Sequence, residues 1–492
     1  MKRRTFLKDL LSGFWGITFI PAMLKSKSNL NKDFSVISGK NDKKNVIVIL
    51  TDSMRADHLG FYGNKWIKTP NLDKFASESA IFDRAYCEGL PTLPTRTAMF
   101  TGKFTFPFRG WQRLEESDVP LAEILWNKGF TNALITDTYH MHKPKMSYER
   151  GFDYVRWIRG QEGDPYIINE NIRVNPEKYF KGNGQKNEET VRRQLIQYLK
   201  NVSWWKGDED HFIAQAAKAG IKFLKEQPRN RNIFLWLDCF DPHEPWDPPP
   251  PFNRMYNPDY KGIELIHPIP GEVEGYLTKD ELKQVKALYA GEVTLVDKWI
   301  GIFLDELKDM GFFENSLIIY VSDHGEPLGE HRIVRKARPW PYEELARIPL
   351  AIRHPEGYGS GKRFGGFVHT CDIMPTILDF LEIKKPGDLT AKSILPILKG
   401  DIEKIHKFGL SAYFKSAWSI RDEDWTYIKW LERSKRDAGF TPWTLGGTLG
   451  APTNPELYFR RDDPYEQNNI INKEPDKAEE LSRELEAFVK KL

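Results

Sequence analysis

Three continuous apolar runs constrain the fold of this chain more than any other feature. They occupy residues 45–50 (NVIVIL), 232–237 (NIFLWL) and 316–321 (SLIIYV). A strand that is buried on both faces has such a run, whereas a strand with one exposed face alternates apolar and polar residues. Helical patterns separate the runs. The sequence therefore predicts an α/β protein with a large, mostly parallel central sheet flanked by helices.

The remaining patterns predict how the chain is divided. Other expected elements are helices at 71–79, 121–128 and 282–307 and a strand at 132–136. Residues 151–206 are charged, aromatic and weakly periodic, which favours an insertion that shapes a substrate entrance. Short strands at 425–430 and 456–459 and an amphipathic helix at 477–490 indicate a smaller C-terminal module. The predicted divisions are an export signal and linker at 1–40, a catalytic α/β domain at 41–404 and an α+β subdomain at 405–492.

Acidic or histidine side chains follow all three apolar runs, and the second run opens into DCFDPHEPW. Asp52 comes after the first run, and Asp323 and His324 come after the third. Ligands of open α/β sheets collect at the carboxyl ends of the strands. Carboxylate oxygens and an imidazole nitrogen, with no thiolate, suit a divalent cation such as Ca²⁺, Mn²⁺ or Zn²⁺. The sequence predicts a site for one such cation.

The segment 85–103 (AYCEGLPTLPTRTAMFTGK) predicts a hydroxyl at a helix N-terminus. Thr92 stands between two prolines, and an apolar periodic run starts at Thr95. Such an end offers unpaired N–H groups to an anion, and Arg96 adds a planar fork for two oxygens. Beside a divalent cation Thr92 could act as a nucleophile. The alternative is a plain helix start capped by Thr95, with Lys103 either near the site or on the surface.

Three histidines and a lysine are further candidates. His243, in the rigid proline-rich stretch DPHEPW, could protonate a leaving oxygen or hold a substrate oxyanion. Lys336 could supply positive charge to the same group, and His140 and His331 are candidates for substrate binding. Each residue alone also fits a rigid loop, a solvated side chain or a turn. Their joint occurrence near strand ends favours a site.

The net charge and the N-terminal leader indicate which partners the protein has and where it is located. The net charge of +3 becomes −3 once the first 40 residues, which carry a net +6, are set aside, so no nucleic-acid partner is expected. Cys87, Cys239 and Cys371 are too few for a disulfide framework. The basic start MKRRTFLK and the short apolar stretch at 10–24 resemble a twin-arginine signal peptide. We therefore expect the twin-arginine machinery to export the protein to the periplasm or beyond.

Several motifs together resemble the sulfatase family of the alkaline-phosphatase superfamily. They are NVIVILTDSMRADHLGFYG, the TLPTR stretch, DPHEPW, SDHGEPLGEHR and VHTCDIMPTILDF, in the family's order and spread over about residues 44–490. The resemblance implies that Asp52, Asp323 and His324 bind a divalent cation. It places Thr92 at the nucleophile position of the family's C-x-P-S-R box. His243 and Lys336 match residues that contact the substrate.

Further positions either match the family or depart from it. Arg96 matches the arginine of the nucleophile box, and His140 matches the histidine of the family's G-K-W-H box, with Thr138 in place of its lysine. Threonine cannot be converted to formylglycine, the aldehyde that most sulfatases use. Ser53 replaces a second aspartate, and His324 stands where many sulfatases have asparagine. These departures make the site similar to the phosphonate monoester hydrolase and phosphodiesterase side of the superfamily.

The sequence thus predicts a metal-dependent ester hydrolase that uses Thr92, with no formylglycine. Phosphate or phosphonate esters are favoured as substrates. Sulfate esters of glycans or aryl groups are the first alternative, and a catalytically silent binding protein of the same fold is the second. A second metal would need Asp241, His243 and His369. Trp157, Tyr166, Trp204 and Trp205 could stack on sugar rings or belong to the core.

Overall fold

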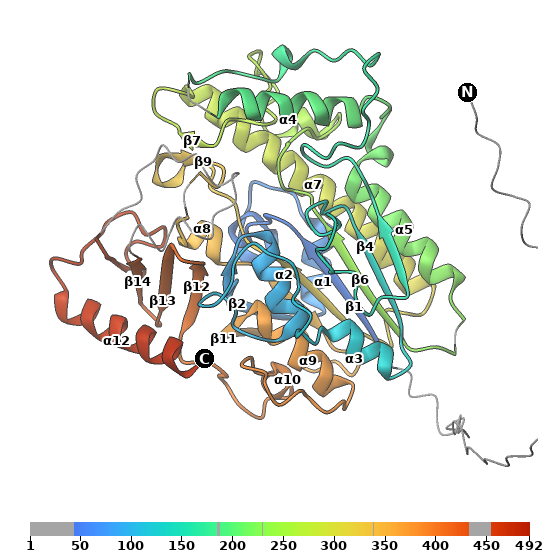
Figure 1. Cartoon of the computed structure of the whole chain (residues 1–492), viewed down its shortest axis with the longest axis vertical. Coiled ribbons are helices and arrows are strands. Elements are labelled where there is room, and N and C mark those ends of the chain that lie inside the picture. The colour runs from blue at the N-terminus through green and yellow to red at the C-terminus, as the bar shows by residue number, and fades with distance from the viewer. Residues whose placement is uncertain (1–43, 185–186, 229, 338, 432–453) are drawn as a thin grey trace, which may run out of the picture. The chain divides into compact units, whose positions relative to one another are not determined.

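A computed structural model describes residues 44–492 apart from 185–186, 229, 338 and 432–453. The predicted leader, linker and export signal lie outside the described residues. The main sheet has eight strands in the order β11-β2-β10-β8-β1-β6-β4-β5 (Figure 1). Their bounds are β1 Asn45–Thr51, β2 Ala80–Tyr86, β4 Thr131–Thr136, β5 Tyr154–Trp157, β6 Ile233–Cys239, β8 Ser316–Ser322, β10 Leu350–Arg353 and β11 Arg363–His369.

Most neighbours in this sheet are parallel, which confirms the predicted fold class. β1 pairs in parallel with β6 and β8, and β4 pairs in parallel with β5 and β6. The exception is β10, which is antiparallel to both β2 and β8. The sheet is therefore mostly parallel, with one reversed strand inside it.

Helices cover both faces of the sheet and explain the continuous apolar runs. Along β1, Ile47 and Ile49 belong to one hydrophobic core, and Val46, Val48 and Leu50 belong to the other. The first core includes residues of α1 (Pro70–Ser77), α5 (Phe212–Glu226) and α7 (Lys279–Asp309). The second includes residues of α2 (Thr92–Thr101), α3 (Leu121–Asn127), α9 (Ile373–Phe380) and α10 (Leu395–Lys399).

A second sheet forms the C-terminal part, with the order β15-β14-β13-β12-β3. Its bounds are β3 Gly89–Leu90, β12 Gly409–Tyr413, β13 Ala417–Arg421, β14 Trp425–Trp430 and β15 Glu456–Phe459, and α12 (Pro475–Lys491) packs on it (Figure 1). β3 pairs with β12 although it comes from the N-terminal half of the chain. This pairing ties the second sheet to the segment that leads into α2. The predicted boundary at residue 405 stays a prediction.

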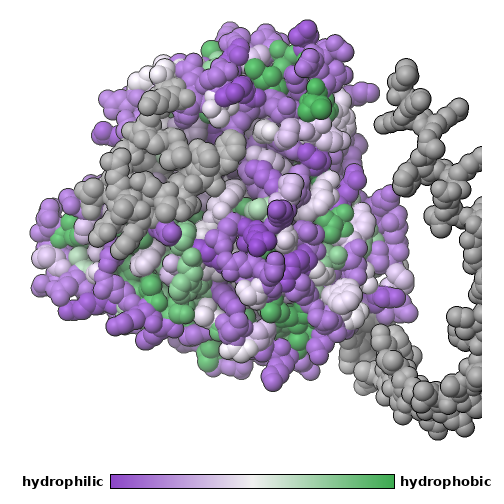
Figure 2. Space-filling view, in the orientation of Figure 1, coloured by the Kyte–Doolittle hydropathy of each residue, from purple (hydrophilic) through white to green (hydrophobic). Residues whose placement is uncertain are grey.

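One further helix of 14 residues and several short elements complete the described chain. They are α4 Glu188–Asn201, α6 Phe252–Met255, α8 Glu343–Ala346, the strand pair β7 Gly271–Glu272 and β9 Ile333–Val334, and 3-10 helices at Ala56–His58, Gly60–Tyr62, Pro176–Lys178, Asp208–Asp210, Glu330–Arg332 and Thr370–Asp372. Within the described part of the chain, no helix is both long and apolar enough to cross a membrane. The face seen in Figure 2 is mainly hydrophilic, with hydrophobic residues in small groups.

Candidate active site

The predicted metal ligands meet at one edge of the main sheet. Thr51 of β1 pairs with Ser322 of β8, so the residues that follow the two strands leave the sheet side by side. Asp52 Oδ1 and Asp323 Oδ2 each lie 3.6 Å from His324 Nε2. All three side chains are fully buried, and their ligand atoms lie within 4.8 Å of one another. This spacing fits one metal ion.

The protonation of these groups also fits a cation. His324 Nδ1 donates to the carbonyl of Gly325 at 2.7 Å, which leaves the lone pair of Nε2 facing the carboxylates. Burial lowers the pKa of His324 to about 4, so the ring is neutral, as a metal ligand must be. Burial and the charge of Asp323 raise the pKa of Asp52 well above its usual value. A divalent cation would offset both the burial of the Asp52 carboxylate and its repulsion by Asp323.

Thr92 lies at the first position of α2, where its hydroxyl faces the metal cluster. Thr92 Oγ1 is 3.4 Å from His324 Nε2, and the side chain is buried. Two features hold the segment in place: β3, just before it, pairs with β12, and the Thr95 hydroxyl donates to the carbonyl of Gly89. The helix begins at Thr92 rather than at Thr95, so Thr92 itself belongs to the first turn of α2.

Arg96 is buried and hydrogen-bonds to several residues of the site. Its Nε and Nη2 donate to the two oxygens of Asp238 at 2.9 and 2.7 Å. Its Nη1 donates to Asp323 Oδ2 at 2.6 Å and to the Thr92 carbonyl at 3.1 Å. All three guanidinium nitrogens are thus engaged, and the side chain is fully buried. These contacts favour a role for Arg96 in positioning Thr92 and Asp323, and its expected contact with substrate oxygens stays a prediction.

Lys336 approaches the same cluster through Ser53. Its Nζ lies 3.3 Å from Ser53 Oγ, and Ser53 Oγ donates to Asp52 Oδ1 at 2.9 Å. Lys336 also forms ion pairs with Glu244 and Glu326. Burial disfavours the charge of Lys336, but the two glutamates outweigh it and raise the lysine pKa above its usual value. Lys336 therefore remains positively charged beside the metal cluster.

His243 and His140 belong to an adjoining network. His243 Nδ1 donates to the carbonyl of Glu244 at 2.8 Å, and burial lowers the pKa of His243 to about 3. The ligand atoms of Glu162, His243 and Glu244 lie within 4.8 Å of one another. Glu162 Oε2 also lies 3.0 Å from His140 Nε2. Glu162 therefore links the two histidines, and Glu244 links His243 to Lys336.

The family is decided by comparison with known proteins. The sulfatase family model matches residues 44–383, which is well over half of the chain. The chain belongs to the sulfatase family. An arylsulfatase of Clostridium perfringens is 30% identical to this sulfatase-family protein over 399 residues, covering 73% of this chain and 79% of the relative. An N-acetylglucosamine-6-O-sulfatase of Bacteroides thetaiotaomicron is 24% identical over 524 aligned positions, covering 88% and 83% of the two chains.

Solved structures support the fold of this sulfatase-family protein. The phosphonate monoester hydrolase of Agrobacterium radiobacter superposes with a TM-score of 0.71 at 20% identity, covering 91% of this chain and 95% of that one. The two therefore share an alkaline-phosphatase-like fold. Together with the family, these relatives make the protein an ester hydrolase.

Two predicted substrate-binding residues of this sulfatase-family protein lie apart from the cluster. Lys103 follows the far end of α2 and pairs with Asp388. His331 stacks on Tyr342 with ring centroids 3.7 Å apart and lies 2.8 Å from Glu344 Oε1. Among the described residues, neither forms a hydrogen bond or an ion pair with Thr92 or the three metal ligands. Their contacts favour a structural role for both.

The His331–Glu344 pair predicts a pH-dependent stability. Burial opposes the positive charge, but the hydrogen bond with Glu344 prevails and raises the pKa of His331 from 6.5 to about 9. A pKa that is raised by folding contributes stability that is fully present below about pH 6.5 and is lost as the pH rises through about 9. We expect His331→Gln to cost on the order of 3 kcal/mol of unfolding free energy at pH 6 and far less at pH 10.

Thermal unfolding of wild type and variant across this pH range tests the expectation. His354→Gln is a matched control, because burial lowers the pKa of His354 to about 4 and its charge does not change in this range. A His331→Gln penalty that stays constant with pH would contradict the assignment of charge to His331.

The alternative second metal site does not assemble. Asp241 accepts hydrogen bonds from the Gln161 side chain at 2.9 Å and from the Ile213 backbone at 2.9 Å. His369 instead groups with Asp372 and His406. Of the aromatic candidates, Tyr166 and Trp204 are exposed, whereas Trp157 and Trp205 pack against the cores.

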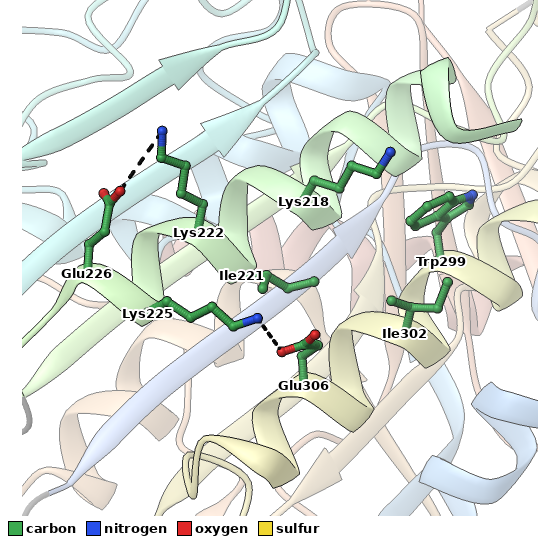
Figure 3. A pocket seen from close by; sticks show the side chains of 8 residues that line it. All are labelled: Lys218, Ile221, Lys222, Lys225, Glu226, Trp299, Ile302 and Glu306. Atoms are coloured by element: carbon green, nitrogen blue, oxygen red, sulfur yellow. Dashed lines mark ion pairs between the residues drawn. The ribbon is translucent and has the colours of Figure 1, made fainter. Parts of the chain in front are cut away.

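A groove of 420 Å³ lies on the outer side of α5 and α7, apart from these residues (Figure 3). Figure 3 shows Lys222 directed at Glu226 and Lys225 directed at Glu306. Lys218 lies over the Trp299 ring, 5.0 Å from its centroid. The groove shares no residue with the metal cluster or its adjoining network, and its lysines pair with Glu226, Glu306 and, outside the groove, Glu209.

Four buried acids of the site are absent from the sequence prediction: Glu162, Asp238, Glu244 and Glu326. The signal for Asp238 is its place in an apolar strand, since a buried acid needs a charged partner. Glu244 and Glu326 adjoin the DPHEPW and SDHGEP motifs. Glu162 carries no such signal, because it lies in the weakly periodic segment and reaches His140 only through the tertiary fold.

Proposed function

We propose that this protein is an exported, metal-dependent hydrolase that uses the Thr92 hydroxyl as its nucleophile. The observation that carries the proposal is the position of Thr92 Oγ1, 3.4 Å from His324 Nε2, where three buried metal-ligand side chains meet. Asp52, Asp323 and His324 would hold one divalent cation, either Ca²⁺, Mn²⁺ or Zn²⁺. When bound, the cation would lower the pKa of a neighbouring hydroxyl and polarise the ester.

The chain's own residues have distinct roles in this proposal. Thr92 Oγ forms a bond to phosphorus or sulfur while the bond to the leaving oxygen breaks, and the hydroxyl proton passes to solvent. Arg96 fixes Thr92 and Asp323, and Lys336 offsets the negative charge of the transferred group. His243 is neutral in the free protein, but an anionic substrate would raise its pKa and allow it to protonate the leaving oxygen. His140, held by Glu162, is the remaining candidate for substrate contact.

The side chain of position 92 favours phosphate and phosphonate esters as substrates. Formylglycine releases sulfate by collapse of a hemiacetal, and threonine cannot form that aldehyde. Water must instead cleave a threonyl ester directly. His324 in the ligand set points the same way, as the resemblance to phosphonate monoester hydrolases implies.

Sulfate esters are the second candidate substrates. The relatives support this candidate, since the 30%-identical protein is an arylsulfatase and another is an N-acetylglucosamine-6-O-sulfatase. A sulfated or phosphorylated glycan would suit an exported protein. Under this alternative the same residues act on sulfur, and the threonyl sulfate is hydrolysed by water.

A three-substrate screen with purified protein tests the proposal. An aryl phosphate diester, an aryl phosphonate and an aryl sulfate are supplied in turn with manganese, zinc or calcium. We expect the phosphorus esters to be cleaved faster than the sulfate. Turnover of the sulfate alone that survives Thr92→Ala would contradict the proposal. Silence on all three substrates with metal bound would favour a binding protein of the same fold.

A further inference from the structure

A second cluster of metal-ligand side chains lies outside the candidate active site. His211 immediately precedes α5, Asp247 lies in the proline-rich segment after β6, and Glu292 lies in α7. α5 and α7 pack against one another, and they run beside each other in Figure 1. Three segments that are distant in the sequence therefore each contribute one side chain to this cluster.

The spacing of the three side chains fits one ion. One ligand atom from each of His211, Asp247 and Glu292 lies within 4.8 Å of the others. Oxygen ligands of a divalent cation such as calcium lie at about 2.3–2.6 Å, so two ligands of one ion are at most about 5 Å apart. The three atoms can therefore surround a single cation without a large movement of the backbone.

The acidic side chains of the cluster have no basic partner. Within the described residues, neither Asp247 nor Glu292 forms an ion pair with lysine or arginine, and the same holds for nearby Asp241. Glu292 is 3% exposed, and its Oε2 has no hydrogen-bond partner. An unpaired acceptor of this kind costs about 1–3 kcal/mol when buried. A ligand that carries positive charge would remove that cost.

The imidazole of His211 is fixed in place by a neighbouring ring. It lies against Trp205, with ring centroids 4.2 Å apart. A fixed imidazole beside two carboxyls is a suitable ligand set for a divalent cation.

The backbone brings Asp247 and Glu292 together at a close contact. A Cβ atom on Gly291 would lie 2.7 Å from the carbonyl oxygen of Phe252 and 2.9 Å from Pro248 Cγ. Both distances are shorter than a real Cβ contact allows, so the proline-rich segment approaches α7 as closely as it does only because position 291 is glycine. Pro248 follows Asp247 and Gly291 precedes Glu292. The same close approach therefore places the two carboxyls in one cluster.

We propose that His211, Asp247 and Glu292 bind a second divalent cation, separate from the active site. Its ligands are two carboxylates and one imidazole, a set that suits Mn²⁺ or Zn²⁺ and can accept Ca²⁺. The ion clamps the DPHEPWD segment to α5 and α7. His243 and Glu244 lie in that segment, so the clamp also holds the network that adjoins the active site. This inference does not depend on the identity of the nucleophile.

Metal analysis of the full-length protein tests the proposed second cation site. After exhaustive dialysis and loading with Mn²⁺, we expect wild type to retain two equivalents per chain. Asp323→Asn and Glu292→Gln should each retain one, and the double variant should retain none. Glu306→Gln is a matched control on the same helix and should retain two, since Glu306 pairs with Lys225 outside the cluster.

Thermal unfolding distinguishes a bound cation at this cluster from the main alternative, a proton shared between Asp247 and Glu292. If the cation binds, Mn²⁺ raises the melting temperature of Asp323→Asn. The further change Glu292→Gln then removes this rise. A shared proton predicts no such rise and no change in metal content with Glu292→Gln. Asp323→Asn leaves the cluster intact, so loss of all metal from this variant would overturn the proposal even if Glu292→Gln failed to fold.

Discussion

Replacing Thr92 with alanine should abolish ester hydrolysis, lowering kcat by at least about a thousandfold. The substitution removes the hydroxyl that faces His324 Nε2 and leaves the helix start and the metal ligands in place. A thousandfold loss corresponds to about 4 kcal/mol of transition-state stabilisation. The measurement is kcat with saturating substrate and metal, together with the bound-metal content, which should not fall.

Two other variants serve as controls for Thr92→Ala. Thr101→Ala makes the same change in a buried threonine at the other end of α2, where the hydroxyl donates to the Thr97 carbonyl. It should keep kcat within about threefold of wild type, since it touches no residue of the site. Thr92→Ser retains the hydroxyl and should restore much of the activity. Near-normal turnover by Thr92→Ala would remove threonine from the mechanism.

The second large effect is expected from Asp323→Asn. Asp323 accepts hydrogen bonds from Arg96 Nη1 at 2.6 Å and from the Ser53 backbone at 3.0 Å, and it belongs to the metal cluster. Loss of a group that only orients a ligand costs about 10–100-fold in metal affinity, so loss of a ligand charge should cost at least about a hundredfold. Activity should fall in parallel at limiting metal.

Calorimetric titration with Mn²⁺ and activity at several metal concentrations measure this loss. Because a second cation site is proposed at His211, Asp247 and Glu292, the titration is run in a Glu292→Gln background. Asp388→Asn serves as the control, since Asp388 is exposed and pairs with Lys103 away from the site. Unchanged affinity and activity in the Asp323 variant would place the catalytic metal elsewhere.

The central sheet and the metal cluster were within reach of sequence reasoning for a physical reason. Runs such as residues 45–50 and 316–321 can be satisfied only by burial on both faces, and parallel strands send their following residues to one edge. Asp52 and Asp323 therefore had to come together if the two strands were neighbours. The antiparallel direction of β10 and the pairing of β3 with β12 have no such local signal, because both depend on long-range topology.

The contacts of single polar side chains were harder to predict. The position of Arg96 one turn after Thr92 is visible in the sequence, but its bidentate contact with Asp238 joins residues 142 positions apart and has no local signal. Lys103 lies beyond the αL residue Gly102 that ends α2, at the opposite end from Thr92. His331 lies near Lys336 in sequence, yet its ring contacts Tyr342 and Glu344 rather than the cluster.

Trapping the covalent intermediate tests the central claim most directly. Wild-type protein with metal is mixed with a slowly hydrolysed aryl phosphonate or aryl phosphate diester, quenched in acid within one turnover and digested for mass spectrometry. We expect the phosphoryl or phosphonyl group on the peptide that contains Thr92, and no modified peptide from Thr92→Ala. Two results would contradict the account. One is product formation within the first turnover without any adduct on Thr92, and the other is an adduct on a different residue.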